Sequence, residues 1–284
     1  MTFSKIAIIG PGLLGGSIAM AARARNVAAR ISVWARREEA LRGVEQLGIA
    51  DCVSTDLKAV VAEAALIVFC VPIGAMSPLA EKMAGYVPAN ALVTDVGSVK
   101  RPVVESLGRI FAGRARFVGS HPMAGSEQTG IEAARADLFE GTVCIVTPEG
   151  NTPPEDVRLA REFWAALGCR PEILTPAEHD EVIALVSHLP HLLAATLVNL
   201  VCEQNADSLN FTGSGFRDTT RVASGSPAMW AEIFDGNREQ VRKSVLALIE
   251  KLKGTLDFMD DDTKMRQFLT DAKSRRDSLK IPKI

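Results

Sequence analysis

The sequence predicts an α/β protein in which a parallel-sheet domain, residues 1–173, is followed by an all-helical domain, residues 174–284. In the first part, short β-branched runs alternate with amphipathic stretches, as in a parallel sheet covered by helices. A glycine-rich turn joins the first predicted strand to the first predicted helix. After about Pro176 the strand signals nearly vanish and helical periodicity takes over, with no linker between the two patterns.

Short runs rich in Val and Ile predict the strands of the first domain. They cover residues 6–9, 31–34, 65–71, 91–95, 116–118 and 142–147. The run at 65–71 is almost entirely apolar, so we expect a strand that is buried on both faces.

Three helices are predicted between or after these strands, at residues 13–25, 38–47 and 153–167. The second has an apolar face, and Gly48 is expected to end it as a C-cap. Two prolines open the third helix, and Gly168 stops it.

The second domain begins with a long apolar stretch at residues 183–201 that is hydrophobic on most sides. A helix of this kind is normally buried in a core or in a subunit interface. Apolar residues at helical spacing predict two further helices: Val241, Val245 and Ile249 belong to one, and Met265, Phe268 and Leu269 to the other.

The bulk composition narrows the class of protein. The net charge is −2 and no long basic run occurs, so nucleic acid is not expected as a partner. No segment is continuously apolar over the ~20 residues of a membrane helix, and the N-terminal apolar stretch is too short for a signal peptide. The five cysteines are scattered and form no CxxC pair, which predicts reduced, buried thiols in a cytoplasmic protein.

The glycine-rich turn reads Gly10-Pro-Gly12-Leu-Leu-Gly15. The first glycine permits a tight turn, the second lets a pyrophosphate approach the backbone, and the third allows close packing of helix and strand. The expected cofactor contacts here are Gly10, Gly12, Leu13, Leu14, Gly15 and Val71, together with Ser98 further along the chain. The alternative is an ordinary glycine turn, but its position at the first strand–helix junction favours a dinucleotide site.

The end of the second strand bears on which nicotinamide cofactor binds. NAD sites usually carry Asp or Glu there, whereas this chain continues with Arg36 and Arg37. A guanidinium matches a 2′-phosphate in charge and geometry, which favours NADP over NAD. The alternative is that both arginines begin a solvated helix, in which Glu38 and Glu39 could also reach the ribose.

Two segments are expected at the carboxyl edge of the sheet, where ligands of such sheets bind. Residues 95–100 contain Ser98, which could also serve as a helix N-cap. Residues 119–127 contain His121, which we expect in a loop between glycines. His188 and His191 are three residues apart, but no third ligand accompanies them, so a polar cluster is favoured over a metal site.

A last polar segment, residues 213–221, combines flexible glycines with two arginines. A solvated surface loop would explain it. However, Phe216, Val222 and Trp230 are interleaved or close by, which indicates partial burial. A partly buried arginine needs an anionic partner from the protein or from a substrate.

Taken together, these motifs resemble the prephenate/arogenate (cyclohexadienyl) dehydrogenase family. The matching segments occur in the family's order: GPGLLGGS at 10–17, DVGSVK at 95–100, GSHPMAGSE at 119–127, HD at 179–180, SHLPH at 187–191 and FRDTTRVA at 216–223. The resemblance implies a Rossmann-like domain, a helical domain that forms a homodimer, and an active site between them. It also implies the stand-alone form of an enzyme that makes the tyrosine precursor by oxidative decarboxylation.

The resemblance implies a role for each candidate residue. His121 would accept or share the proton of the substrate hydroxyl, and Ser98 would hold that hydroxyl and fix the orientation of His121. The expected substrate contacts are Arg221 at a carboxylate, Ser187 and His191 at the end nearer the helical domain, and His179 and Trp230 along the pocket.

Two other functions remain possible at this point. One is another dehydrogenase with a Rossmann and a helical domain, and the other is a non-catalytic NADP-sensing protein. The choice between prephenate and arogenate also stays open. An acidic residue near the substrate side chain would favour arogenate, and Glu127, Asp180 and Asp218 are the candidates.

Overall fold

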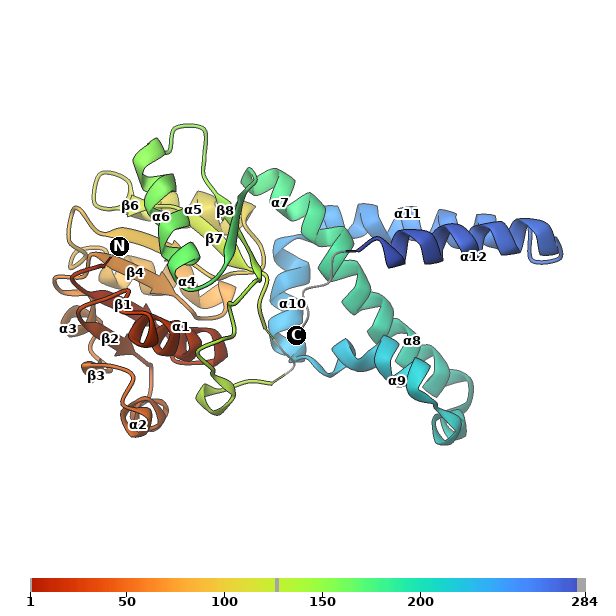
Figure 1. The fold of residues 1–284 in the computed structure, drawn as a ribbon, viewed down its shortest axis with the longest axis horizontal. Coiled ribbons are helices and arrows are strands. Elements are labelled where there is room, and N and C mark those ends of the chain that lie inside the picture. Colours follow the sequence, from red (N-terminus) through yellow and green to blue (C-terminus); the bar gives the residue numbers. More distant parts are fainter. Residues whose placement is uncertain (1, 126–127, 280–284) are drawn as a thin grey trace.

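The computed structural model describes residues 2–125 and 128–279 and contains a sheet domain and a helical domain (Figure 1). The main sheet has six parallel strands in the order β3-β2-β1-β4-β5-β6, which is that of a doubly wound dinucleotide-binding fold. Its strands are β1 (Ile6–Ile9), β2 (Ile31–Trp34), β3 (Cys52–Ser54), β4 (Leu66–Phe69), β5 (Leu92–Asp95) and β6 (Arg116–Phe117).

Helices cover both faces of this sheet. One face packs against α1 (Leu13–Ala24), α2 (Glu38–Leu47) and α6 (Pro154–Ala166). The other packs against α3 (Leu57–Val61), α4 (Ile73–Met83) and α5 (Arg101–Phe111). The β1 and β4 side chains are buried on both faces, as expected for central parallel strands. The predicted parallel α/β domain is therefore confirmed, and Gly48 ends α2 with a left-handed φ of 61°.

A second, smaller sheet corrects one prediction. His121 lies in a strand, β7 (Gly119–Pro122), and not in a loop. β7 pairs antiparallel with β8 (Val143–Thr147), which pairs parallel with β9 (Arg170–Ile173). The polar sequence of β7 gives little strand signal, and its pairing with β8 comes from a segment more than 20 residues away.

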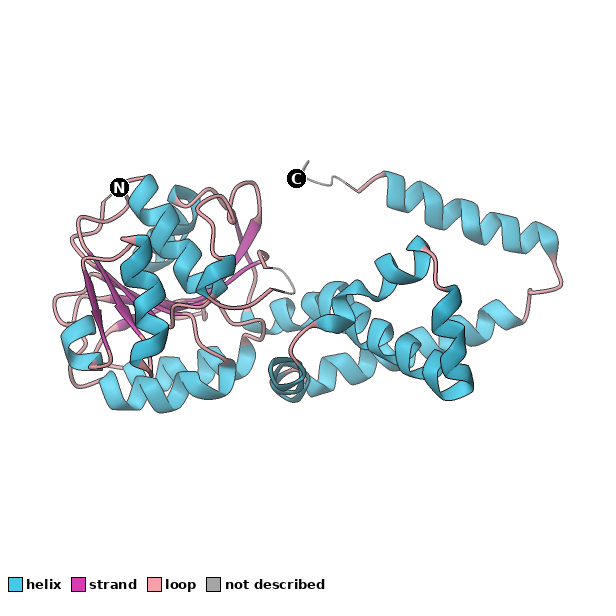
Figure 2. Ribbon diagram, turned by 90° about the horizontal axis from the view of Figure 1, so that it is seen from below, coloured by secondary structure: helices cyan, strands magenta, loops and turns pink. Residues whose placement is uncertain are grey.

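The remainder of the described chain is helical (Figure 2). It begins with α7 (Pro176–Ile183), a π-helical turn η2 (Ala184–His188) and α8 (Leu189–Asn205). The 3-10 helix η3 (Ala206–Phe211), α9 (Ser214–Thr220) and the 3-10 helix η4 (Arg221–Ser224) follow. The domain ends with α10 (Pro227–Gly236), α11 (Arg238–Leu256) and α12 (Asp262–Asp277).

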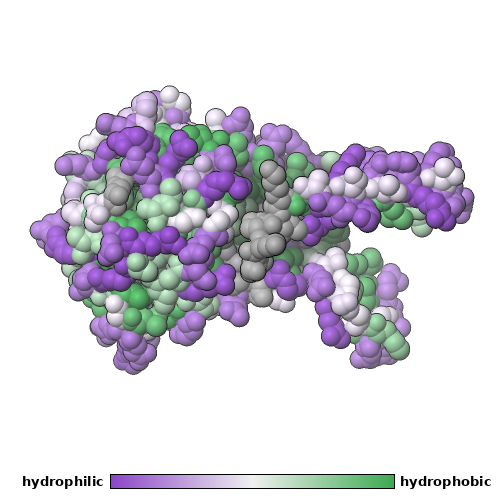
Figure 3. Space-filling view, in the orientation of Figure 1, coloured by the Kyte–Doolittle hydropathy of each residue, from purple (hydrophilic) through white to green (hydrophobic). Residues whose placement is uncertain are grey.

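The long apolar helix is far more exposed in a single chain than a core helix would be. The continuous run from Pro176 to Phe211 is long and apolar enough, by length and composition alone, to cross a membrane, yet only 28% of its most apolar window is buried. Hydrophobic surface lies along the arm formed by α8 and α9 (Figure 3). Of the two environments predicted for this helix, an interface fits better than a core.

The prediction of buried thiols is only partly correct. All five cysteines are free, and Cys144 and Cys169 are buried. Cys52 is exposed because it lies on β3, the edge strand of the main sheet.

Candidate active site

The glycine-rich turn has the geometry of a dinucleotide cradle. Gly10 has a φ of +107°, and a Cβ there would lie 2.7 Å from the carbonyl oxygen of Cys70 and 2.8 Å from Cγ1 of Val71. A Cβ at Gly15 would lie 1.9 Å from the Gly10 oxygen. At Gly12 no described residue has a heavy atom within 4 Å of the Cβ position. The first and third glycines are thus required by the protein itself, whereas the second faces open space.

This open space suits a nicotinamide dinucleotide. Gly12 is the N-cap of α1 and provides no side-chain cap, so the first turn of the helix can receive a phosphate. Leu13 and Leu14 form that first turn and pack against the core. Arg36 and Arg37 are exposed directly after β2, whose Trp34 pairs with Ile9 of β1, so they follow the strand beside the turn.

A chain of hydrogen bonds joins the two domains at His121. Its Nδ1 lies 2.9 Å from Nε2 of His179, and Nδ1 of His179 lies 2.8 Å from Oδ1 of Asp180. His179 and Asp180 come from α7, whose N-terminus is fixed by a capping box of Thr175 and Glu178. The side chains of His121, His179 and Asp180 are all buried.

Asp180 is held in turn by the N-terminus of α5. Its two carboxylate oxygens accept hydrogen bonds from the N–H groups of Lys100 (2.7 Å) and Arg101 (2.9 Å). Burial alone would raise the pKa of Asp180. The hydrogen bonds from His179 and from these two N–H groups outweigh burial, so the pKa is lowered and the carboxylate is ionised.

A buried ion pair lies beneath the same site. Lys100 Nζ donates to Asp95, and both side chains are fully buried. Asp95 also accepts from the N–H groups of Gly97 (2.8 Å) and Ser120 (3.1 Å), so it ties the loop after β5 to β7. Burial, followed by His179 and Lys100, holds the pKa of His121 well below its usual value. His121 is therefore neutral at physiological pH, as a general base must be.

Two predictions about Ser98 need correction. α5 begins at Arg101 with Lys100 as its N-cap, so Ser98 does not cap the helix. Within the described residues, the Nδ1 atom of His121 is bonded to His179, and Ser98 makes no hydrogen bond to the ring. Ser98 stays at the carboxyl end of β5 in the loop that the Asp95–Lys100 pair anchors.

His179 and Asp180 also differ from expectation. His179 was expected to line the pocket, but it is fully buried and both of its ring nitrogens are engaged. Asp180 has its carboxylate occupied by three donors, so it does not offer a free acidic group to a substrate ammonium. Asp218 is exposed on α9, and Glu127 lies outside the described residues.

A second group of candidate residues gathers around Trp230. His191 stacks on this indole with ring centroids 3.5 Å apart and planes 12° apart. A Cβ at Gly225, just after η4, would lie 2.6 Å from Trp230 Nε1 and 3.2 Å from His191. The η4 turn, which begins with Arg221, therefore ends against this stack. Ser187 is half-buried on η2, one turn before His191.

His188 links the two groups and was not assigned a role from the sequence. Its Nδ1 lies 3.2 Å from Asn237, which donates to the backbone oxygen of Asp180 (2.7 Å). Its ring also meets Trp230 edge-on, with centroids 6.1 Å apart. Among the described residues, the buried Nδ1 of His191 has no hydrogen-bond partner within the protein. A hydrogen bond with the backbone of Ser98 partly counteracts the lowering of the pKa of His188 by burial. The sequence pointed to His188 only through its spacing of three residues from His191, which favoured a polar cluster there.

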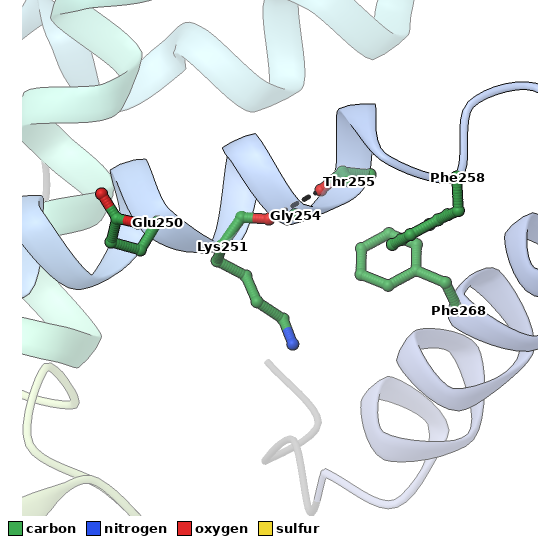
Figure 4. A pocket seen from close by; sticks show the side chains of 6 residues that line it. All are labelled: Glu250, Lys251, Gly254, Thr255, Phe258 and Phe268. Carbon is green, nitrogen blue, oxygen red and sulfur yellow. Dashed lines mark hydrogen bonds between the residues drawn. The ribbon is translucent and has the colours of Figure 1, made fainter.

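Neither of two other features competes with this site. In residues 2–125 and 128–279, no three His, Cys, Asp or Glu side chains are grouped to hold a metal ion. A hollow of about 150 Å³ lies between α11 and α12, where Phe258 faces Phe268 (Figure 4). It is smaller than the ~300–1,000 Å³ of typical ligand pockets.

The buried histidines predict a specific pH dependence of stability. Burial lowers the pKa of all four, that of His188 to about 4. As the pH falls below ~6.5, the histidines of the unfolded chain bind protons, whereas those of the folded chain stay neutral until a lower pH. The free energy of unfolding therefore decreases as the pH falls below this value. His188 alone contributes about 3 kcal/mol by this linkage.

We expect the melting temperature to fall between ~pH 6.5 and ~pH 4. The His188→Gln variant should show a shallower fall, measured by thermal denaturation across that range. Equal slopes for wild type and variant would contradict a buried neutral His188.

The chain matches two models of known protein families in succession. Residues 18–173 match the model described as prephenate dehydrogenase, nucleotide-binding domain. Residues 175–270 match the model described as prephenate dehydrogenase, dimerization domain. Together the two models account for most of the chain.

Individual relatives agree with the models. Cyclohexadienyl dehydrogenase of Zymomonas mobilis is 33% identical over 280 residues, which is 96% of this chain and 95% of that protein. The structure of prephenate dehydrogenase from A. aeolicus with hydroxyphenyl propionate and NAD+ has a TM-score of 0.91 and 30% identity, and covers 97% of this chain and 98% of its own. Synechocystis arogenate dehydrogenase has a TM-score of 0.82 and 30% identity, with coverages of 96% and 99%. The chain therefore belongs to the prephenate dehydrogenase family.

Proposed function

We propose that this chain catalyses the oxidative decarboxylation of prephenate, arogenate or both with a nicotinamide cofactor, giving 4-hydroxyphenylpyruvate or tyrosine. The observation that carries the proposal is His121, a buried neutral imidazole where the helical domain meets the carboxyl ends of the strands. Family membership sets aside the other Rossmann-plus-helical dehydrogenases.

The reaction needs a proton acceptor beside a hydroxyl group. Two bonds of the substrate ring break, and the ring becomes aromatic. One is the C–H bond at the hydroxyl-bearing carbon, and the other is the C–CO₂ bond at the opposite ring position. A bound nicotinamide supplies the acceptor for the hydrogen and two electrons of that C–H bond. His121 takes the hydroxyl proton as the carbonyl forms and returns it to the phenolate oxygen after carbon dioxide has left. Ser98 holds the hydroxyl. Because aromatisation drives the reaction, these residues mainly orient and polarise the substrate.

The other end of the substrate is assigned to the Trp230 group. Arg221 binds a carboxylate as a charged donor, with Ser187 and His191 at the same end. The stacked His191–Trp230 pair and the unpartnered, buried Nδ1 of His191, within the described residues, support a polar ligand there. A homodimer is supported by the dimerization-domain match and by the exposed apolar arm.

NADP is the proposed cofactor, although the A. aeolicus structure was solved with NAD+. We expect Arg36→Asp to shift the NADP/NAD preference toward NAD by about 10- to 100-fold, because it removes a charged hydrogen-bond partner of the 2′-phosphate. The ratio of kcat/KM for the two cofactors measures this. Arg42→Asp, an equal charge change on the exposed side of α2, is the matched control. An unmoved preference would contradict the role of Arg36.

The function is tested by nicotinamide reduction with the purified protein, crossing NADP and NAD with prephenate and arogenate. Reduction in any of the four mixtures supports the proposal and reveals both preferences. If none of the four mixtures shows reduction, the melting temperature with each ligand tests for a non-catalytic NADP sensor. NADP would raise the melting temperature of such a sensor, whereas prephenate and arogenate would not.

A further inference from the structure

The hydrogen-bonded chain behind His121 has a defined direction. Asp180 accepts at both carboxylate oxygens from the N–H groups of Lys100 and Arg101, so it is an acceptor in all its contacts. Nδ1 of His179, 2.8 Å from Oδ1 of Asp180, must therefore carry a proton. In a neutral imidazole the other nitrogen is then bare, so Nε2 of His179 is an acceptor.

The direction continues to the ring of His121. Its Nδ1 lies 2.9 Å from the bare Nε2 of His179, so Nδ1 of His121 must be the donor. The opposite tautomer would set two nitrogen lone pairs against each other at this distance. The remaining nitrogen of His121, Nε2, then has a free lone pair.

We infer that His179 and Asp180 are positioning residues that hold His121 in the tautomer whose Nε2 can accept the substrate proton. This inference rests on the proposed function and deepens it. It gives His179 a role behind the base instead of a contact with substrate. In the Ser-His-Asp triad a carboxylate also fixes the tautomer of the catalytic imidazole, there by a direct hydrogen bond, and the wrong tautomer lowers turnover strongly.

The charges balance through the reaction. When Nε2 takes the hydroxyl proton, His121 becomes an imidazolium with both nitrogens protonated. Its Nδ1 proton stays in place and points at His179, and the ionised Asp180 lies one ring further away. The buried carboxylate thus offsets the positive charge that the buried Lys100 disfavours. No proton has to leave the chain, because His121 returns its proton to the product.

The arrangement also couples catalysis to domain docking. His121 belongs to β7 of the sheet domain, whereas His179 and Asp180 belong to α7, and Asp180 is seated on the N-terminus of α5. A base with the correct tautomer exists only when α7 is docked against the sheet domain.

Two substitutions of His179 separate positioning from packing. His179→Leu fills the space but offers no acceptor, so kcat should fall by about 10²-fold with little change in KM. His179→Gln carries an amide oxygen that can accept from Nδ1 of His121, so its kcat should stay within about tenfold of wild type. Asp156→Asn, which alters a buried carboxylate paired with Arg116, is the control for lost stability and should keep kcat.

A second measurement needs neither substrate nor turnover. Nitrogen chemical shifts of ¹⁵N-histidine, assigned by single histidine substitutions, report which nitrogen of His121 is protonated. We expect a proton on Nδ1 and a bare Nε2 in wild type and in His179→Gln, and loss of this single tautomer in His179→Leu.

The two readouts keep the two proposals distinct. An inactive wild type that shows the expected tautomer would contradict the proposed function but not the positioning role. An active wild type with its proton on Nε2, or His179→Leu with wild-type kcat, would overturn the positioning role. Equal losses of kcat in His179→Gln and His179→Leu at equal melting temperatures would also overturn it.

Discussion

Replacing His121 with asparagine is expected to lower turnover by ~10²–10⁴-fold with only a modest change in the Michaelis constants. The substitution removes Nε2, the atom that would take the hydroxyl proton. The asparagine amide nitrogen lies about where Nδ1 of the imidazole lies, so it can still donate to His179. The hydrogen bond that ties β7 to α7 is therefore retained, and the loss should fall on kcat.

The measurement is steady-state nicotinamide reduction with saturating cofactor, and the control is the melting temperature with and without NADP. A variant with a normal melting temperature, a normal NADP-induced shift and low kcat supports the base. Wild-type turnover in the same variant would remove His121 from the proton transfer. Loss of the NADP-induced shift would instead mean that the cofactor site has been disturbed.

The sheet domain could be predicted because its signals are local. β1, β2, β4 and β5 are short buried runs of apolar residues, and their pattern does not depend on distant partners. β7 and β9 were missed for the opposite reason. β7 reads Gly-Ser-His-Pro and β9 Arg-Pro-Glu-Ile, so both exist through pairing with β8.

The candidate site divides in the same way. The glycine turn and Ser98 follow strands that the sequence already marks, and His121 comes shortly after the predicted strand at 116–118, although it lies in β7 itself. The partners of His121 could not be found from the sequence, because they are distant along the chain. His179 lies 58 residues after His121, and Asp180 lies 80 residues after Lys100, whose N–H donates a hydrogen bond to it. Histidine followed by aspartate in a helix gives no sign of which side chain is buried or what it faces.

The helical domain shows a third limit. Apolar periodicity in α8 and α11 predicts a face that needs covering, but it cannot say whether the cover is the same chain or another one. Leu200 and Leu252 are about half exposed in the single chain. The dimerization-domain match supplies what the pattern could not.

The glycine turn gives the second large effect, because Gly12 and Gly15 differ in what surrounds them. Alanine at Gly12 would place its Cβ in open space, and the φ of −72° suits any residue. We therefore expect Gly12→Ala to keep the wild-type melting temperature. Its cofactor should bind much more weakly, because the methyl group stands where the pyrophosphate approaches the backbone.

Alanine at Gly15 should behave in the opposite order. Its Cβ would lie 1.9 Å from the Gly10 oxygen, so the turn must open, at a cost of about 1–3 kcal/mol or more before any ligand is added. Thermal denaturation of both variants with and without NADP measures the difference, and Gly85→Ala, where nothing lies within 4 Å, is the control. Wild type at 100 times its dissociation constant should gain about 2.7 kcal/mol. An undiminished gain in Gly12→Ala would mean that the dinucleotide does not approach this turn, because no residue in 2–125 or 128–279 comes close enough to oppose a methyl group there.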